Sequence, residues 1–386
     1  MESNIGNKLK GNVDSFLSRE DSRVIKGIAI ILMLTHHLWG FPDRVAGGTL
    51  KHLITFDGQP LILYLAYFAK ICVSLYFFVG GYGMYISNKD RKFDPVKKLK
   101  KLYISYWKVF IVFIPIAFLF FSSQIPYCEK KSIYSRYNVF SIRECIENFL
   151  GVRSSYNGEW WFLYSYVIAV ISFPLLRWII NRHSVIINIF MVLIGTIMVT
   201  TLFPAIGNIE IIGKLNDNYL YSHFFCQRAP FISCFWMGAV VAKDGLLNRL
   251  SEAMKSEKLL NPVTDILILG FIIYLRQATI GDILDVFFVP VLIVVSIDLL
   301  NRFRFLRKFF DKIGSQSTNM WLIHSFCCYY FYALVRIVVF PKWAVPSLLV
   351  LIAISYALSV LLTLFWKAVG LIIFFFEKRK KSENFI

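Results

Sequence analysis

Two histidines and a lysine on one apolar segment are the residues of this sequence best suited to chemistry. Lys26 and His37 lie eleven residues apart within the stretch 23–39, which is otherwise largely apolar. Eleven residues are about three helical turns, so both side chains fall on one helix face, roughly 16 Å apart along the axis. Histidine can accept a proton near neutral pH. A cation three turns away suits a long co-substrate that has negative charge at one end and transfers a chemical group from the other. His36 is rotated by about 100° from His37, which predicts a different role.

A second interpretation of this segment requires no chemistry. Lys26 would then extend to the inner membrane surface, and His37 would hydrogen-bond a neighbouring helix. The spacing alone does not choose between the two interpretations. Ionisable residues inside membrane segments are costly to insert, so each is first treated as a functional candidate.

Other candidates lie later in the chain. Glu159, Trp160 and Trp161 open an apolar stretch, where tryptophans are typical of an aromatic belt and also offer a surface on which a sugar can stack. If a sugar stacks on these tryptophans, Glu159 would accept hydrogen bonds from the sugar hydroxyls. His324 and Arg228 are candidates for supporting the reaction, although packing or ion pairing explains each equally well. No cysteine spacing indicates a metal site, and none is expected.

The composition predicts that a membrane protein positions these residues. Of the 386 residues, 57% are hydrophobic and 17% are charged, whereas soluble domains carry about a quarter charged residues. A bilayer core about 30 Å thick needs roughly 20 apolar residues as a helix. Ten such stretches run near 24–42, 60–87, 102–121, 160–180, 185–203, 226–242, 262–276, 282–300, 316–340 and 345–376. We therefore expect an all-α integral membrane protein, a bundle of about ten transmembrane helices.

The positive charges indicate topology rather than nucleic-acid binding. The formal net charge is +18, but the basic residues lie in short segments between the apolar stretches. With the N-terminus in the cytoplasm, the inner segments hold 26 Lys and Arg and the outer ones hold 10. This asymmetry predicts cytoplasmic termini. It divides the chain into an N-terminal segment 1–23, one transmembrane domain 24–376 with an external loop 122–158, and a basic tail 377–386. Within that loop, Cys128 and Cys145 could pair if the compartment is oxidising.

Four segments resemble motifs of the membrane acyltransferase-3 family, in the family's order. Lys26-Gly-Ile-Ala followed by His37 resembles the family's first helix, in which Arg or Lys precedes His by eleven residues. The other three are similar to the motifs FFVLSGF, RxxRIYPxYW and a Trp-x-Leu to Phe-Pro pattern, at residues 76–82, 98–107 and 161–174. The stretch 320–324, which ends in His324, is similar to a late family motif that also ends in histidine.

The departures from these motifs indicate a divergent subgroup. Lysine stands at Lys26, Lys98 and Lys101 where arginine is usual, which keeps the charge but loses the bidentate fork for phosphate. Tyr166 occupies the place of a common glutamate, and Gly80 that of a serine.

The resemblance implies an enzyme that acts across a bacterial plasma (inner) membrane. The family's members are ten-span O-acyltransferases of cell-surface glycans. It implies acetyl-CoA or another acyl-CoA as co-substrate and no bound cofactor, with the donor phosphates near Lys26, Lys98 and Lys101. His37, with His36 beside it, would deprotonate a sugar hydroxyl of an exported or lipid-linked polysaccharide, or form an acyl-histidine. Glu159, Trp160 and Trp161 would contact the acceptor, and a homo-oligomer is left open.

Two other classes compete with this prediction. A glycan transporter or flippase would favour inverted repeats and broken helices, and no repeat is evident in the sequence. A glycan polymerase would use an arginine-rich outer loop, and the loop 122–158 contains Arg136, Arg143 and Arg153.

Overall fold

The computed structural model describes residues 15–56, 58–207, 209, 229–278 and 281–383. Arg228, a predicted supporting residue, lies outside these described residues. The described residues form two compact units. Unit 1 consists of those within 1–25, 74–93 and 172–308, and unit 2 of those within 26–73, 94–171 and 309–386. Each unit therefore combines segments that are far apart in the sequence.

Helices make up nearly all of both units. Helices α1 (Arg19–Gly40), α3 (Cys72–Ser87), α7 (Trp161–Arg182) and α15 (Arg304–Ser315) each contribute residues to both. The other elements of unit 1 are α8 (Val185–Ile197), the π-helical η3 (Met198–Leu202), α9 (Phe203–Gly207), α11 (Ala229–Asp244), α12 (Leu246–Ser256), α13 (Pro262–Ala278), η5 (Gly281–Leu284) and α14 (Asp285–Arg302).

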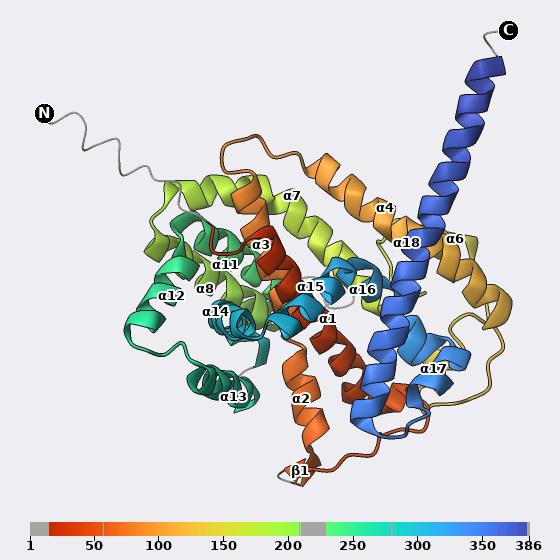
Figure 1. Cartoon of the computed structure of the whole chain (residues 1–386), viewed down its shortest axis with the longest axis horizontal. Coiled ribbons are helices and arrows are strands. Elements are labelled where there is room, and N and C mark those ends of the chain that lie inside the picture. The colour runs from red at the N-terminus through yellow and green to blue at the C-terminus, as the bar shows by residue number, and fades with distance from the viewer. Residues whose placement is uncertain (1–14, 57, 208, 210–228, 279–280, 384–386) are drawn as a thin grey trace, which may run out of the picture. The chain divides into compact units, whose positions relative to one another are not determined.

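Unit 2 contains the predicted site residues that the structure describes. Its other elements are η1 (Pro42–Arg44), β1 (Thr55–Phe56), β2 (Gln59–Pro60), α2 (Leu61–Ala69), α4 (Pro95–Phe120), α5 (Lys131–Tyr134), α6 (Ile142–Phe149), η2 (Gly158–Trp160), α16 (Ser317–Ser325), the π-helical η6 (Phe326–Tyr330), α17 (Tyr332–Val339) and α18 (Ala344–Glu383). The strands are two residues each and pair antiparallel. Helix α18 is 40 residues long and runs as one unbroken helix (Figure 1).

The structure confirms an all-α membrane protein. In the described part of the chain, six helical segments are long and apolar enough to cross a bilayer, and a bent pair would make a seventh. The six are Leu61–Ser87, Pro95–Phe120, Gly158–Arg182, Val185–Ile206, Asp282–Arg302 and Ala344–Glu377. The count of ten spans and the cytoplasmic position of both termini stay predictions.

One predicted span is sharply bent. The sequence pattern predicts a continuous helix over 316–340, but the chain turns by 85° between Tyr330 and Tyr332. Phe331 has extended backbone angles, which end the helical hydrogen bonding. The side chain of Gln124 bonds to backbone groups on both sides of this break. Its amide donates to the Tyr330 carbonyl at 2.9 Å and accepts from the Tyr332 N–H at 2.9 Å. The bend follows a π-helical turn, a feature that often accompanies functional sites.

The buried carboxylate of Asp285 in unit 1 is paired with a cation, which offsets the cost of burying its charge. Asp285 is fully buried and accepts from Arg276 at 2.8 Å and from the Ser74 hydroxyl at 2.6 Å. Arg276 also binds Asp282 at 2.6 Å. This network joins α3, α13 and α14 within the unit.

Two glycines bring α3 and α11 into backbone contact. A Cβ added at Gly81 would overlap with the carbonyl oxygen of Phe235, and one added at Gly238 would overlap with that of Phe78. Small residues allow this approach between membrane helices, where packing drives association. Gly81 of the segment 76–82 therefore has a structural explanation.

Gly81→Val should destabilise the protein by about 1–3 kcal/mol, because the added carbons force α3 away from α11. The measurement is thermal unfolding of purified protein in detergent. Gly83→Ala is the control, since nothing lies within 4 Å of a Cβ there and alanine favours the helix. Equal melting temperatures for Gly81→Val and the wild type would contradict the close contact.

Candidate functional site

A cavity of about 370 Å³ in unit 2 collects most of the predicted catalytic and acceptor-binding residues. His36, His37, Glu159 and Trp161 line it, together with Arg44. The lining comes from α1, η1, the start of α3, α5 and the residues beside it, η2, the start of α7, α16 and η6. This volume lies in the range of small-molecule sites.

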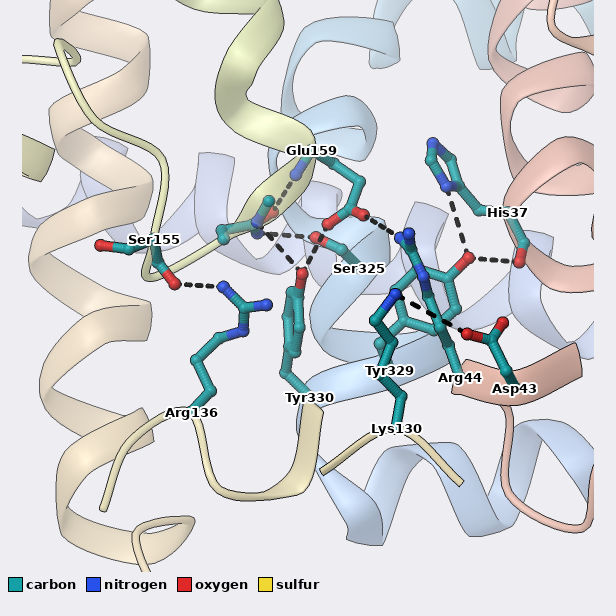
Figure 2. A network of polar contacts seen from close by, with 12 residues as sticks. His37, Asp43, Arg44, Lys130, Arg136, Ser155, Glu159, Ser325, Tyr329 and Tyr330 are labelled. Atoms are coloured by element: carbon teal, nitrogen blue, oxygen red, sulfur yellow. Dashed lines mark hydrogen bonds and ion pairs between the residues drawn. The ribbon is translucent and has the colours of Figure 1, made fainter. Parts of the chain in front are cut away.

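His37 is held by Tyr329. The Tyr329 hydroxyl donates its proton to the backbone carbonyl of His37 and lies 3.4 Å from His37 Nδ1 (Figure 2). Because that proton is already used, the Tyr329 oxygen can only accept at Nδ1. We infer that Nδ1 carries the hydrogen and that Nε2 carries the lone pair. That tautomer is the one a general base acting through Nε2 requires.

The two neighbouring histidines have different partners. His36 Nδ1 donates to the Ala66 carbonyl at 2.8 Å, and its ring centre lies 5.1 Å from that of His37. His324, from α16, is fully buried with its ring centre 5.0 Å from His37. His324 Nδ1 donates to the Trp321 carbonyl at 2.7 Å, and His324 Nε2 has no hydrogen-bond partner among the described residues. The structure thus groups three histidines that the sequence places in two distant segments.

Glu159 is a buried carboxylate at the centre of the polar network. Asn157 caps the short helix η2 by accepting from the Glu159 N–H at 3.2 Å, which fixes the backbone at this position. The Glu159 carboxylate then accepts from Arg44 at 3.4 Å and from the Tyr330 hydroxyl at 2.8 Å (Figure 2). Its side chain is only 5% exposed, and these contacts offset the cost of burying it.

The adjacent tryptophans take different positions. Trp161 lines the cavity. Trp160 is buried behind it, where the indole N–H donates to the Leu322 carbonyl at 3.0 Å and the ring packs edge-on against Tyr106. Trp160 therefore supports the start of α7, and Trp161 is the one with access to a ligand in the cavity.

Two arginines in the cavity lining were missed as site residues by the sequence analysis. Arg44 follows His37 by seven residues in η1, and Arg136 belongs to the loop 122–158. Burial opposes the charge on Arg136, but Tyr330, Tyr137 and Glu159 outweigh it and raise the pKa of Arg136. The guanidinium therefore stays charged. No motif marks either arginine, because only the tertiary fold brings them beside Glu159.

The three predicted donor-binding lysines lie together. Lys26 on α1 is close enough to Lys98 and Lys101 on α4 for their charges to repel. Lys98 and Lys101 are exposed, and Lys26 is half-buried. Asp94 starts α4 by accepting from the Lys97 N–H at 3.0 Å, and Pro95 stands at its first turn. This cap places both lysines on the first two turns of the helix. A cluster of like charges is stabilised when an anion binds it.

A protein-family model matches most of the chain. The acyltransferase-3 model, described as an acyltransferase domain, matches residues 20–365. The chain belongs to the acyltransferase-3 family. It is therefore a multi-pass membrane acyltransferase. No curated protein and no solved structure matches it.

The described part of this acyltransferase contains no group of three or more His, Cys, Asp or Glu side chains able to hold a metal ion. Cys128 and Cys145 are both free thiols.

Glu159→Gln should lower the melting temperature of the acyltransferase, with a loss of about 1–3 kcal/mol, because Arg44 would keep a buried charge without its carboxylate. Glu147→Gln is the matched control. Glu147 also contacts two arginines, Arg143 at 2.9 Å and Arg153 at 3.1 Å, but in the loop and accessible to water. Equal melting temperatures for the two variants would show that Glu159 is not the centre of the network.

Proposed function

We propose that this acyltransferase moves an acyl group, most simply acetyl, from acyl-CoA to a sugar hydroxyl of an exported or lipid-linked surface polysaccharide. The observation that carries the proposal is the arrangement along α1. Lys26 belongs to a lysine cluster, and His37, with the Tyr329 hydroxyl beside its Nδ1, lies three turns away and lines a cavity.

The lysine cluster suits the phosphates of coenzyme A. Lys26, Lys98 and Lys101 supply three positive charges, and lysine binds phosphate as a point charge. The roughly 16 Å between Lys26 and His37 along the helix axis would be spanned by the extended pantetheine arm. The thioester would then reach His37, and the acyl-CoA would serve as co-substrate, with no bound cofactor required.

The reaction assigns one proton transfer to His37. Its Nε2 takes the proton of the acceptor hydroxyl, and the hydroxyl oxygen attacks the thioester carbonyl. The C–S bond then breaks, the acyl group remains on the sugar oxygen, and the departing thiolate takes the proton from His37 as coenzyme A leaves. In the variant mechanism, His37 itself carries the acyl group before the sugar accepts it.

The acceptor would occupy the cavity. Trp161 offers a ring for stacking against a sugar, and the Glu159 network offers polar contacts for its hydroxyls. Trp160 would act only by supporting Trp161. Transfer to a glycan outside a bacterial plasma membrane fits the external position predicted for the loop 122–158.

His37→Ala should abolish acyl-CoA turnover while His52→Ala leaves it unchanged, because His52 lies outside the cavity lining and its side chain hydrogen-bonds the Leu50 carbonyl of its own loop. The assay uses purified protein in liposomes with radiolabelled acetyl-CoA and measures the release of free coenzyme A and the label on protein. Lys26→Ala should weaken binding of acetyl-CoA. Label retained on the wild type would favour the acyl-histidine variant.

Two results would contradict the proposal. If folded wild-type protein binds no acyl-CoA, a transporter or flippase becomes the better explanation. If the protein extends glycan chains without acyl-CoA, a glycan polymerase becomes the better explanation.

Tyr329→Phe should lower kcat for acetyl-CoA turnover about tenfold with KM for acetyl-CoA unchanged, because the hydroxyl that fixes the His37 tautomer is lost. Tyr332→Phe is the control, since the Tyr332 ring stacks on Tyr127 and its hydroxyl has no hydrogen bond among the described residues. A fall in kcat of equal size in both variants would mean that Tyr329 acts by packing alone.

A further inference from the structure

The cavity lining carries more positive than negative charge. Its cations are Arg44, Lys70, Lys130 and Arg136, and Glu159 is the one carboxylate among the lining residues. An excess of cations in a partly buried space favours an anionic ligand. The proposed acyl group is uncharged, so it does not account for this excess.

Ion pairs within unit 2 offset part of this charge. Arg44 pairs with Glu159 at 3.4 Å, and Lys130 pairs with Asp43 at 3.7 Å near the surface. Arg136 has no carboxylate within 4.0 Å in the described part of the chain. Its guanidinium lies 4.6 Å from the centre of the Tyr330 ring, and Nη1 donates to the Ser155 carbonyl (Figure 2). Its buried Nε has no hydrogen-bond partner there.

We propose that Arg136 binds an anionic group of the acceptor, a carboxylate or a phosphate, so that the enzyme acylates an acidic glycan. This inference rests on the proposed function, because it names the class of acceptor for that site. A guanidinium presents paired N–H donors that match the oxygens of a carboxylate or a phosphate. The excess of positive charge around it would strengthen the contact.

The position of Arg136 argues against two other roles. The donor phosphates are assigned to the lysine cluster, which begins eleven residues before His37 on α1. Stabilising the reacting carbonyl would require a cation beside His37. In Figure 2, Tyr330 and Glu159 lie between Arg136 and His37, and Arg44 and Lys130 are on the His37 side. Arg136 is therefore placed to bind a part of the acceptor away from the reacting hydroxyl.

The test measures binding of three probes to the whole protein in nanodiscs of uncharged lipid. The probes are a glucose disaccharide, the same disaccharide oxidised to a carboxylate at C6, and its C6 phosphate. Wild type should bind at least one charged probe about tenfold or more tightly than the neutral one. The charged probe that binds more tightly shows whether the anionic group of the acceptor is a carboxylate or a phosphate.

Variants assign the preference to Arg136. Arg136→Gln should remove it, and Arg136→Lys should retain part of it because the charge remains. Arg143→Gln is the matched control, since Arg143 belongs to the same loop, is 89% exposed and pairs with Glu147. Melting temperatures of all variants are measured, and the Lys variant keeps the test valid if the Gln variant folds poorly.

The outcomes separate this inference from the proposed function. Equal binding of charged and neutral probes by wild type, no binding of any probe up to its solubility limit, or a preference that survives in Arg136→Gln overturns the anion site. A charge preference that depends on Arg136, in a protein that transfers no acyl group from acetyl-CoA, supports the anion site and rejects acyl transfer.

Discussion

The architecture of the cavity depends on giving one buried carboxylate its partners. Glu159 is almost fully buried, and a buried charge is tolerated only with close partners. Arg44 and Tyr330 are those partners, and they belong to elements far apart in the sequence, η1 after α1 and η6 after α16. Satisfying Glu159 therefore draws these elements together around the space that His37 faces.

The same network sets the chemistry available at His37. The π-helical turn that carries Tyr330 to Glu159 also carries Tyr329 to His37. One local distortion thus positions both the partner of the acid and the partner of the base. Because Tyr329 is fully buried, the hydrogen bond that its hydroxyl donates to His37 is shielded from solvent and is electrostatically stronger than it would be in water.

Periodicity and hydropathy were sufficient for the parts of the fold that depend on local sequence. The helix period places Lys26 and His37 on one helix, which α1 confirms, and the apolar stretches predict the all-α membrane class. The bend after Tyr330 was not predictable, since it depends on Gln124 from another segment. The separation of Trp160 from Trp161 was also hidden, because adjacent helical residues point about 100° apart and the pattern does not say which one is buried.

Gln124 has a consequence for how the enzyme can diverge. Its side-chain amide makes hydrogen bonds in place of backbone hydrogen bonds lost at the bend. It belongs to the segment between α4 and α7, which also contains Lys130, Arg136 and Asn157. On the proposed assignment, the donor end is encoded in α1 and α4, whereas the acceptor end is encoded largely in this one connecting segment. Exchanging the other residues of that segment while keeping Gln124 would change the acceptor and leave the donor end and the bend beside Tyr329 intact, so the two halves of the specificity can evolve separately.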